Sequence, residues 1–162
     1  MTARSRNPLS LDTRVLGSLL GHNCRRAHLA VLEHVVPKVS SYGLSAPSFA
    51  VLSLVQHNPG LSSGQICRAL RIRTSNIVAV IAGLKSQELI EQRPHPTDRR
   101  VLGIHLTAAG RRLTSRAYRD IVQAERSATA MLTDAEREQL IVLLRRIHSS
   151  SADRPGSRSE QE

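Results

Sequence analysis

Two short helical segments with a tight turn between them stand in the middle of the chain. Ser62 and Gln65 are three residues apart at the start of an apolar run, which is the spacing of a capping box. A helix over about 63–70 and a second helix over about 74–87 are therefore predicted, joined by a turn of about four residues. Helices of this length with such a turn form a helix-turn-helix unit. Its small core is expected to contain Ile66, Ala69, Leu70, Ile72, Ile77, Val80, Ile81 and Leu84.

A basic hairpin is predicted directly after this unit. Residues 89–93 and 102–106 can pair as two strands, because apolar residues in the second segment recur at every other position. The loop between them holds two prolines and the pair Arg99 and Arg100. The order helix, turn, helix, hairpin is that of a winged helix, in which the hairpin is the wing.

Four further helices are predicted on the two sides of the winged helix. Ser45, Thr107 and Thr133 can cap three of them. The first helix should end at Pro37 and the Ser-Ser-Tyr-Gly cluster that follows it. The four helices are expected over about 11–40, 46–57, 107–131 and 134–147.

The composition restricts both the core and the partners of the chain. Aromatic residues make up 2% of the 162 residues, so the core must consist of aliphatic side chains, which favours helices packed on helices. The formal charge is +10, and of the 23 basic residues only Lys38 and Lys85 are lysines. An excess of arginine of this size attracts polyanions, with nucleic acid ahead of a membrane surface.

Several other classes of protein are disfavoured by the sequence. There is no apolar run long enough to span a bilayer and no secretory signal, so a cytoplasmic protein is expected. Cys24 and Cys67 have no spacing of a disulfide framework or a metal site. Neither a glycine-rich phosphate loop nor a nucleophile elbow is present, so no enzyme and no cofactor are predicted.

The stretch from Leu61 to Leu113 resembles the MarR family of winged-helix transcriptional regulators. It looks like the family's wing and the exit from the wing into a dimerisation helix. The residues that carry this likeness are Arg93-Pro94, Asp98-Arg99-Arg100 and Leu106-Thr107-Ala108-Ala109-Gly110.

The resemblance implies a mainly α fold with a small β-hairpin wing. A single domain is expected over 10–148, with a DNA-binding lobe at about 45–106 and dimerisation helices at about 10–40 and 107–148. Residues 1–9 and 149–162 are polar and are expected to be disordered. Such homodimers place one helix of each lobe in a major groove and each wing in a minor groove. They bind pseudo-palindromic operators, usually repress, and are released by a small ligand.

Ten residues are candidates for contacts with double-stranded DNA. Hydroxyl and amide groups can donate to phosphates or base edges, and a narrow minor groove attracts inserted arginines. For the two serines at 62 and 63, a capping role alone explains them equally well. The candidates are Ser62, Ser63, Arg71, Arg73, Thr74, Ser75, Asn76, Ala79, Arg99 and Arg100.

The sequence departs from the family at two of these positions. Members often have a long polar residue near the position of Ala79, so the wing arginines should carry a large share of recognition here. Val78 and Ala79 can contact a thymine methyl group instead. Arg71 stands where many members have a turn glycine. By similarity to the family, Asp98 orients a neighbouring arginine rather than touching DNA.

The effector predicted from the resemblance is a small organic ligand, such as an aromatic acid or an aryl thioester. Its candidate contacts are His22, Arg25, Arg26 and His28, which otherwise face solvent or a second subunit. A redox sensor acting through Cys24 is an alternative, although that position lies on the apolar stripe of the first predicted helix. This stripe consists of Leu16, Leu20, Cys24, Ala27, Val31 and Val35. Another alternative is an architectural DNA-binding protein of low sequence specificity. No metal site is predicted, because no third ligand joins Cys24 and His28.

Overall fold

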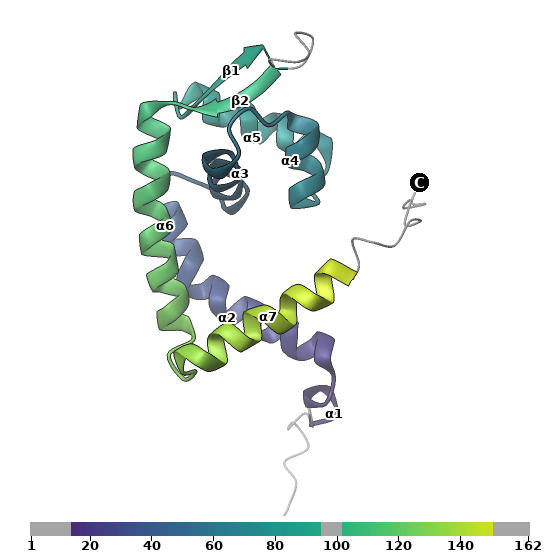
Figure 1. Ribbon diagram of the computed structural model, residues 1–162. Helices are drawn as coiled ribbons and strands as arrows, with labels where there is room; N and C mark the ends of the chain where they lie inside the picture. The colour runs from purple at the N-terminus through teal and green to yellow at the C-terminus, as the bar shows by residue number, and fades with distance from the viewer. Residues whose placement is uncertain (1–13, 95–101, 151–162) are drawn as a thin grey trace, which may run out of the picture. The chain divides into compact units, whose positions relative to one another are not determined.

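The computed structural model describes residues 14–94 and 102–150 of the chain (Figure 1). It is mainly helical with one two-stranded hairpin, which confirms the predicted fold class. It forms two compact units, one up to Ala128 and one from Thr129. The elements are α1 (Arg14–Gly17), α2 (Leu20–Ser40), α3 (Ala46–His57), α4 (Ser63–Leu70), α5 (Thr74–Ser86), β1 (Ile90–Pro94), β2 (Leu102–Leu106), α6 (Ala108–Ala128) and α7 (Asp134–Ser150).

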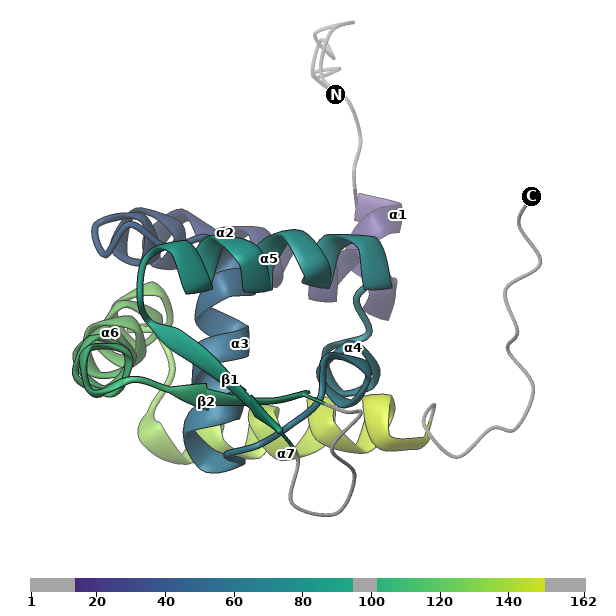
Figure 2. The same cartoon turned by 90° about the horizontal axis from the view of Figure 1, so that it is seen from above.

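The first unit has a winged-helix lobe, in which α3, α4, α5 and the hairpin gather around one core (Figure 2). α3 supplies Val51, Leu52 and Val55, which are at most 1% exposed. α2 packs along α6 on the side of the lobe away from α4. The predicted core is confirmed except for Ala69, which is exposed. The short helix α4 buries only one of its sides, and Ala69 lies on the other. The full core consists of Val39, Leu44, Val51, Leu52, Val55, Ile66, Ile77, Ile81, Leu84, Leu89, Ile90, Ile104, Leu106, Ala117 and Ile121.

The two strands pair antiparallel, with Ile90 opposite Leu106 and Pro94 opposite Leu102. The segment before α4 adds to the same sheet, because the Ile104 amide donates to the Leu61 carbonyl and the Ile104 carbonyl accepts from the Gly60 amide, both at 2.9 Å. A Cβ atom on Gly103 would lie 2.8 Å from the Gly60 carbonyl oxygen. The wing is therefore held to the lobe by backbone pairing.

The start of α6 explains the motif Leu-Thr-Ala-Ala-Gly. The Thr107 hydroxyl donates to the Glu88 carbonyl at 2.8 Å and accepts from the Gly110 amide at 2.9 Å. Gly110 is buried against the backbone of Leu89, and a Cβ atom there would lie 2.0 Å from the Leu89 carbonyl oxygen. The motif joins the wing to the long helix, and its glycine is required by this close approach.

The expected first helix is confirmed at its end and is wrong in one detail. It is interrupted at Ser18 and Leu19, where the Asn23 side-chain amide donates to the carbonyls of Gly17 and Leu19, both at 2.8 Å. The Leu19 carbonyl also accepts from the Asn23 backbone amide at 3.1 Å, and the side-chain amide reaches across the break to the Gly17 carbonyl. The helix ends at Ser40, as expected; Pro37 lies within its last turn, where the Ser41 amide donates to the Pro37 carbonyl.

The other helix ends lie close to the expected positions. α6 stops at Ala128 rather than near Met131, and α7 continues to Ser150 rather than ending near Ile147. Ser149 and Ser150, expected to begin a disordered tail, therefore belong to a helix. The caps predicted at Ser45 and Ser62 are confirmed, including the complete capping box between Ser62 and Gln65.

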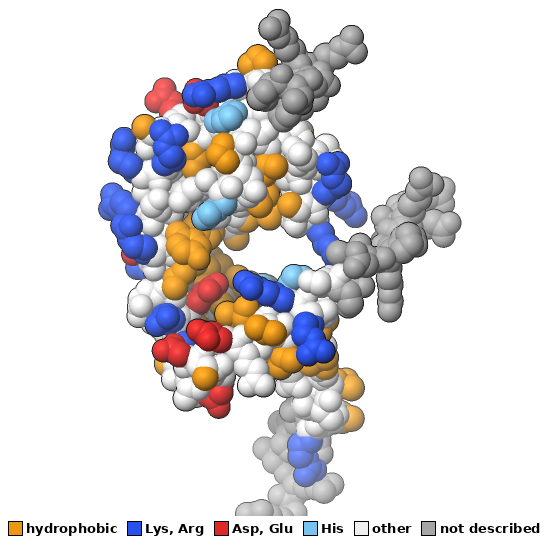
Figure 3. All heavy atoms as spheres, in the orientation of Figure 1, with side chains coloured by type: hydrophobic (Ala, Val, Ile, Leu, Met, Phe, Trp, Pro, Cys, Tyr) orange, Lys and Arg blue, Asp and Glu red, His pale blue; other side chains and the backbone are white. Residues whose placement is uncertain are grey.

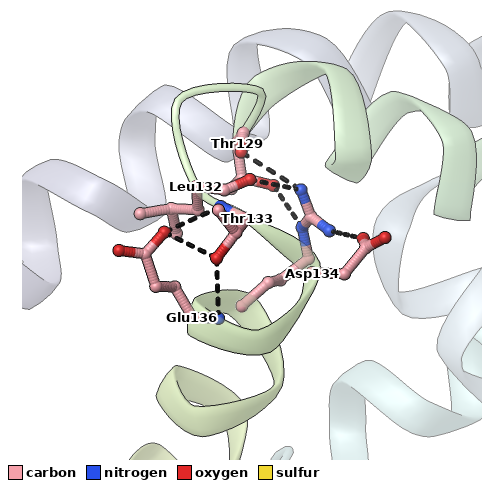
Figure 4. A network of polar contacts seen from close by, with 6 residues as sticks. Thr129, Leu132, Thr133, Asp134 and Glu136 are labelled. Carbon is pink, nitrogen blue, oxygen red and sulfur yellow. Dashed lines mark hydrogen bonds and ion pairs between the residues drawn. The ribbon is translucent and has the colours of Figure 1, made fainter.

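The second unit begins with another capping box (Figure 4). The Glu136 carboxylate accepts from the Thr133 amide and hydroxyl, both at 2.8 Å, while the Glu136 amide donates to the Thr133 hydroxyl. The bond from the Thr133 backbone, followed by that from its side chain, lowers the pKa of Glu136 below its ordinary value of 4.5. Arg137 fastens the preceding turn, donating to the Thr129 hydroxyl at 2.9 Å and to the Leu132 carbonyl. The predicted cap is confirmed, with a charged partner.

Candidate nucleic-acid interface

α5 has one buried face and one open face. Ile77, Ile81 and Leu84 point into the core. The opposite face is exposed along the whole helix, and Val78 is 59% exposed although it is apolar. Its residues recur at helical spacing, so they lie on one side. This open face consists of Ser75, Val78, Ala79, Ala82 and Lys85.

The first turn of α5 presents polar groups to solvent. The predicted contacts Thr74, Ser75 and Asn76 are all exposed there. The residue before the helix is Arg73, which makes no side-chain cap bond, in contrast to Ser45 before α3. The amides at a helix start favour anions, and a phosphate suits them when no side chain does the capping.

The turn before α5 adds positive charge. Arg71 and Arg73 are exposed on its two sides, and Arg71 has the left-handed backbone conformation, with φ 51° and ψ 42°. A residue other than glycine is uncommon there, so the turn keeps its shape at the expense of strain. Arg71 stands where many members of the family have glycine, and the turn is nevertheless left-handed at this residue.

Arg68 belongs to this basic group and was not predicted from the sequence. Arg68 on α4 is exposed and lies on the same segment, and the sequence from Glu33 to Glu88 contains no other acidic residue. In the space-filling view, basic side chains gather around α4 and its turn without an acidic neighbour (Figure 3). The absence of acidic residues between Glu33 and Glu88 was the feature of the sequence that could have identified Arg68 as part of a basic surface. A surface of this kind attracts a polyanion.

Ser62 and Ser63, at the start of α4, differ in the surroundings of their side chains. The Ser62 hydroxyl accepts from the Gln65 amide at 3.3 Å and donates to the Gln65 side chain at 3.1 Å, so capping already uses it. Ser63 is half-buried. A DNA contact at these two positions stays a prediction.

The base of the wing is described, but its tip is not. Arg93 on β1 is exposed and pairs with Glu91 two residues before it. Asp98, Arg99 and Arg100 lie outside the described residues, so their predicted roles stay predictions from the sequence.

The proposed effector contacts lie on α2. His22 is half-buried, whereas Arg25, Arg26 and His28 are exposed. Cys24 is half-buried, as expected for its place on the apolar stripe. His22, Arg25 and Arg26 are spaced i, i+3 and i+4 and share one face of α2, and His28 lies one turn after Arg25; a ligand contact at these positions stays a prediction.

Two polar groups that the sequence analysis did not single out lie inside the first unit. The Ser53 hydroxyl and the Gln56 side-chain carbonyl on α3 are buried and have no hydrogen-bond partner among the residues that the structure describes. The Gln56 amide donates to the Ser115 hydroxyl of α6 at 3.3 Å. The signal in the sequence was the three-residue spacing of Ser53 and Gln56, which places both on one face of an otherwise apolar helix.

The described residues also limit other functions. None of the helices within 14–94 and 102–150 is long and apolar enough to cross a membrane. Among the same residues, no three His, Cys, Asp or Glu side chains come together as a metal site would require.

An exposed helix after a tight turn, a basic surface and a paired wing define a winged-helix DNA-binding protein. A model of the MarR family matches residues 42–101. A predicted transcriptional regulatory protein for the hcr operon of Thauera aromatica is 30% identical over 139 residues, which cover 85% of this chain and 84% of the relative. The chain belongs to the MarR family, a family of DNA-binding transcriptional regulators and not of enzymes.

Solved structures agree over most of the chain. The CouR transcriptional repressor bound to a 23-mer DNA duplex is 31% identical with a TM-score of 0.79, covering 86% of this chain and 99% of that one. CouR from Rhodococcus jostii RHA1 bound to p-coumaroyl-CoA is 25% identical with a TM-score of 0.75, covering 87% and 96%. BpsR of Bordetella bronchiseptica, whose DNA binding is regulated by 6-hydroxynicotinic acid, is 27% identical with a TM-score of 0.73, covering 82% and 94%.

Proposed function

We propose that this chain is a homodimeric repressor that binds a pseudo-palindromic operator and is released by a small aromatic acid or its thioester. The observation that carries the proposal is the open face of α5, a helix without acidic residues that follows the basic turn with Arg71 and Arg73. A duplex has a negative charge on every phosphate, so contacts from arginines release counterions and supply affinity. The CouR repressor, similar over nearly its whole length, is known with a DNA duplex.

The dimer is supported by apolar surface on the terminal helices. Val15, Leu19 and Leu20 are between 52% and 71% exposed near the start of the described chain. On α7 the side chains of Leu140, Ile141, Val142, Leu143, Leu144 and Ile147 are 40–53% exposed. Clusters of this size on a soluble regulator mark a protein–protein surface. A second copy of the chain is the proposed partner for both.

The ligand class is supported by the relatives and by charge. CouR from Rhodococcus jostii RHA1 binds p-coumaroyl-CoA, and 6-hydroxynicotinic acid regulates BpsR. Arg25 and Arg26 on α2 offer guanidinium groups that suit a carboxylate or a coenzyme phosphate.

The test is a footprint on the DNA upstream of the chain's own gene, in the presence and absence of hydroxybenzoic, nicotinic and hydroxycinnamic acids and of a hydroxycinnamoyl thioester. The expected result is a protected region with two-fold sequence symmetry that disappears with one of these compounds. A competition against bulk DNA at fixed salt is run beside it. Equal affinity for both DNAs would contradict the repressor and favour the architectural alternative.

A second arm tests the arginine pair. Arg25→Ala together with Arg26→Ala is expected to bind the operator as well as the wild type and to require a higher concentration of the acid for release. If the double variant is released at the same concentration, these two arginines do not contact the ligand. Arg112→Ala, which removes an exposed arginine from α6, is the matched control.

A further inference from the structure

The open face of α5 is almost without groups that read bases by hydrogen bonds. Between Ser75 and Lys85 it presents Val78, Ala79 and Ala82, all exposed, while the exposed Asn76 lies at the edge of this face in the first turn. The common base-reading side chains are arginine, lysine, asparagine and glutamine, which make paired hydrogen bonds to purines. Within the described residues, the middle of this helix therefore offers methyl groups and no such pair.

Charge at the two ends suits the phosphate walls of a major groove. Arg73 stands directly before the helix and Lys85 lies in its last turn. Twelve residues of helix separate them, which is about 18 Å. The groove is about 12 Å wide, so the ends of such a helix lie nearer the phosphates than its middle does. The apolar centre is then the part that faces the base edges.

Of the four base edges in the major groove, only thymine presents a methyl group. We propose that Val78, with Ala79 and Ala82 beside it, selects operators by packing on the C5-methyl groups of thymines. This rests on the proposed function, since it requires α5 to lie in a major groove. It names Val78 as a specificity-determining residue and the thymine methyl as what the residue recognises.

Exposure of Val78 distinguishes this role from a structural one. A valine that is 59% exposed contributes little to the core, and valine is less favourable than alanine within a helix. Val78→Ala should therefore keep the stability of the protein or raise it slightly. Any loss of DNA affinity in this variant then reflects the lost contact and not unfolding.

The experiment removes the methyl group from the DNA alone. A pool of random duplexes is enriched for binding to the full chain, and the selected duplex is synthesised with deoxyuridine in place of one thymidine at a time. Uracil pairs as thymine does and lacks only the C5-methyl group. Loss of one methyl contact is expected to weaken binding about four-fold, from about 0.8 kcal/mol per buried carbon, and symmetric replacement in both half-sites about fifteen-fold.

The Val78→Ala variant supplies the cross-check. It is expected to bind the thymine duplex about as weakly as the wild type binds the uracil duplex, and to lose sensitivity to uracil at the same positions. Val78→Thr, of nearly the same shape, should be intermediate. Uracil at thymines outside the half-sites is the control and should change nothing.

Two different results would overturn the proposals, and they are distinguishable. If the wild type selects a duplex but binds every uracil-substituted version equally well, thymine methyl recognition is wrong. The same holds if Val78→Ala stays as sensitive to uracil as the wild type. If no duplex is enriched over bulk DNA, the proposed sequence-specific function fails first.

Discussion

The winged lobe and α7 differ in how far their apolar side chains are buried. In the lobe, Val51 and Leu52 of α3 are fully buried within one chain. In α7, every side chain from Leu140 to Ser149 is exposed, although six of these ten are apolar. A stretch of leucines left in water is unfavourable by about 25 cal/mol for each Å² of apolar surface. The apolar side chains of the lobe are thus buried within a single chain, and those of α7 are the surface that the proposed second chain would cover.

The largest expected effect is on the completeness of the lobe. Gly110→Ala places a methyl group 2.0 Å from the Leu89 carbonyl oxygen, which is backbone and cannot turn away. The free energy of unfolding should fall by about 3 kcal/mol, as in severe overpacking. Chemical denaturation measures the loss.

Gly83→Ala on α5 is the matched control. Nothing lies within 4 Å of a Cβ atom there, so the same substitution should stabilise the helix by about 0.5–1 kcal/mol. Equal effects of the two variants would show that the approach of Gly110 to the wing is not as close as described.

The second effect is on the partner surface. Leu144→Glu on α7 introduces a charge into the exposed apolar cluster and should shift the dimer to single chains at micromolar concentration. Burying an unpaired carboxylate is strongly unfavourable. Gln139→Glu adds the same charge to an exposed polar position of α7 and should leave the dimer intact. Analytical ultracentrifugation distinguishes the two, and a dimer in both variants would remove α7 from the interface.

The third effect concerns the basic surface of the lobe. Arg73→Ala should weaken DNA binding about ten-fold and reduce by about one the slope of affinity against salt concentration, as loss of one phosphate contact does. Arg112→Ala serves as the control on α6. A lower affinity with an unchanged salt slope would mean that Arg73 does not contact phosphate.

The turn before α5 gives a smaller effect of mixed sign. Arg71→Gly should raise the free energy of unfolding by about 1 kcal/mol, because glycine adopts the left-handed conformation without strain. It should also weaken DNA binding, since a cation is lost. Glu88 has the same conformation, with φ 56°, so Glu88→Gly should stabilise the protein without lowering DNA affinity. Calorimetry and a binding titration separate the two properties.

The smallest effect distinguishes the two capping boxes. The α4 box uses Gln65, which does not titrate, whereas the α7 box uses Glu136. The lowered pKa of Glu136 means that its contribution to α7 is complete above pH 4.5, the ordinary value, and is lost as the pH falls through the lowered pKa. Hydrogen exchange at the start of α7 should quicken in acid, while α4 stays unchanged. In Glu136→Gln the acid dependence should disappear.

How much of the fold could be predicted from the sequence depends on how far apart in the chain the interacting groups lie. The caps at Ser45 and Ser62 follow from side chains three residues from the amides they bind, so the sequence predicts them. The break at Ser18 does not, because it depends on where the Asn23 amide points. The approach of Gly110 to Leu89 is also hidden, since the two residues meet only when the wing and α6 are both in place.

The same distinction holds for the candidate site. The exposed face of α5 could be predicted because helical spacing separates it from the core residues. The partner of the Ser62 hydroxyl and the buried Ser53 hydroxyl could be located only from the packed structure. The likeness of the wing motif to a known family identified the class of protein, while the tip residues Arg99 and Arg100 keep only their predicted roles.

The claim that a second chain completes the terminal helices is tested most directly by the mass of the full chain in solution. Light scattering at micromolar concentration, without DNA, is predicted to give twice the 17.8 kDa of one chain. A mass of 17.8 kDa at every concentration up to the limit of solubility would contradict the account.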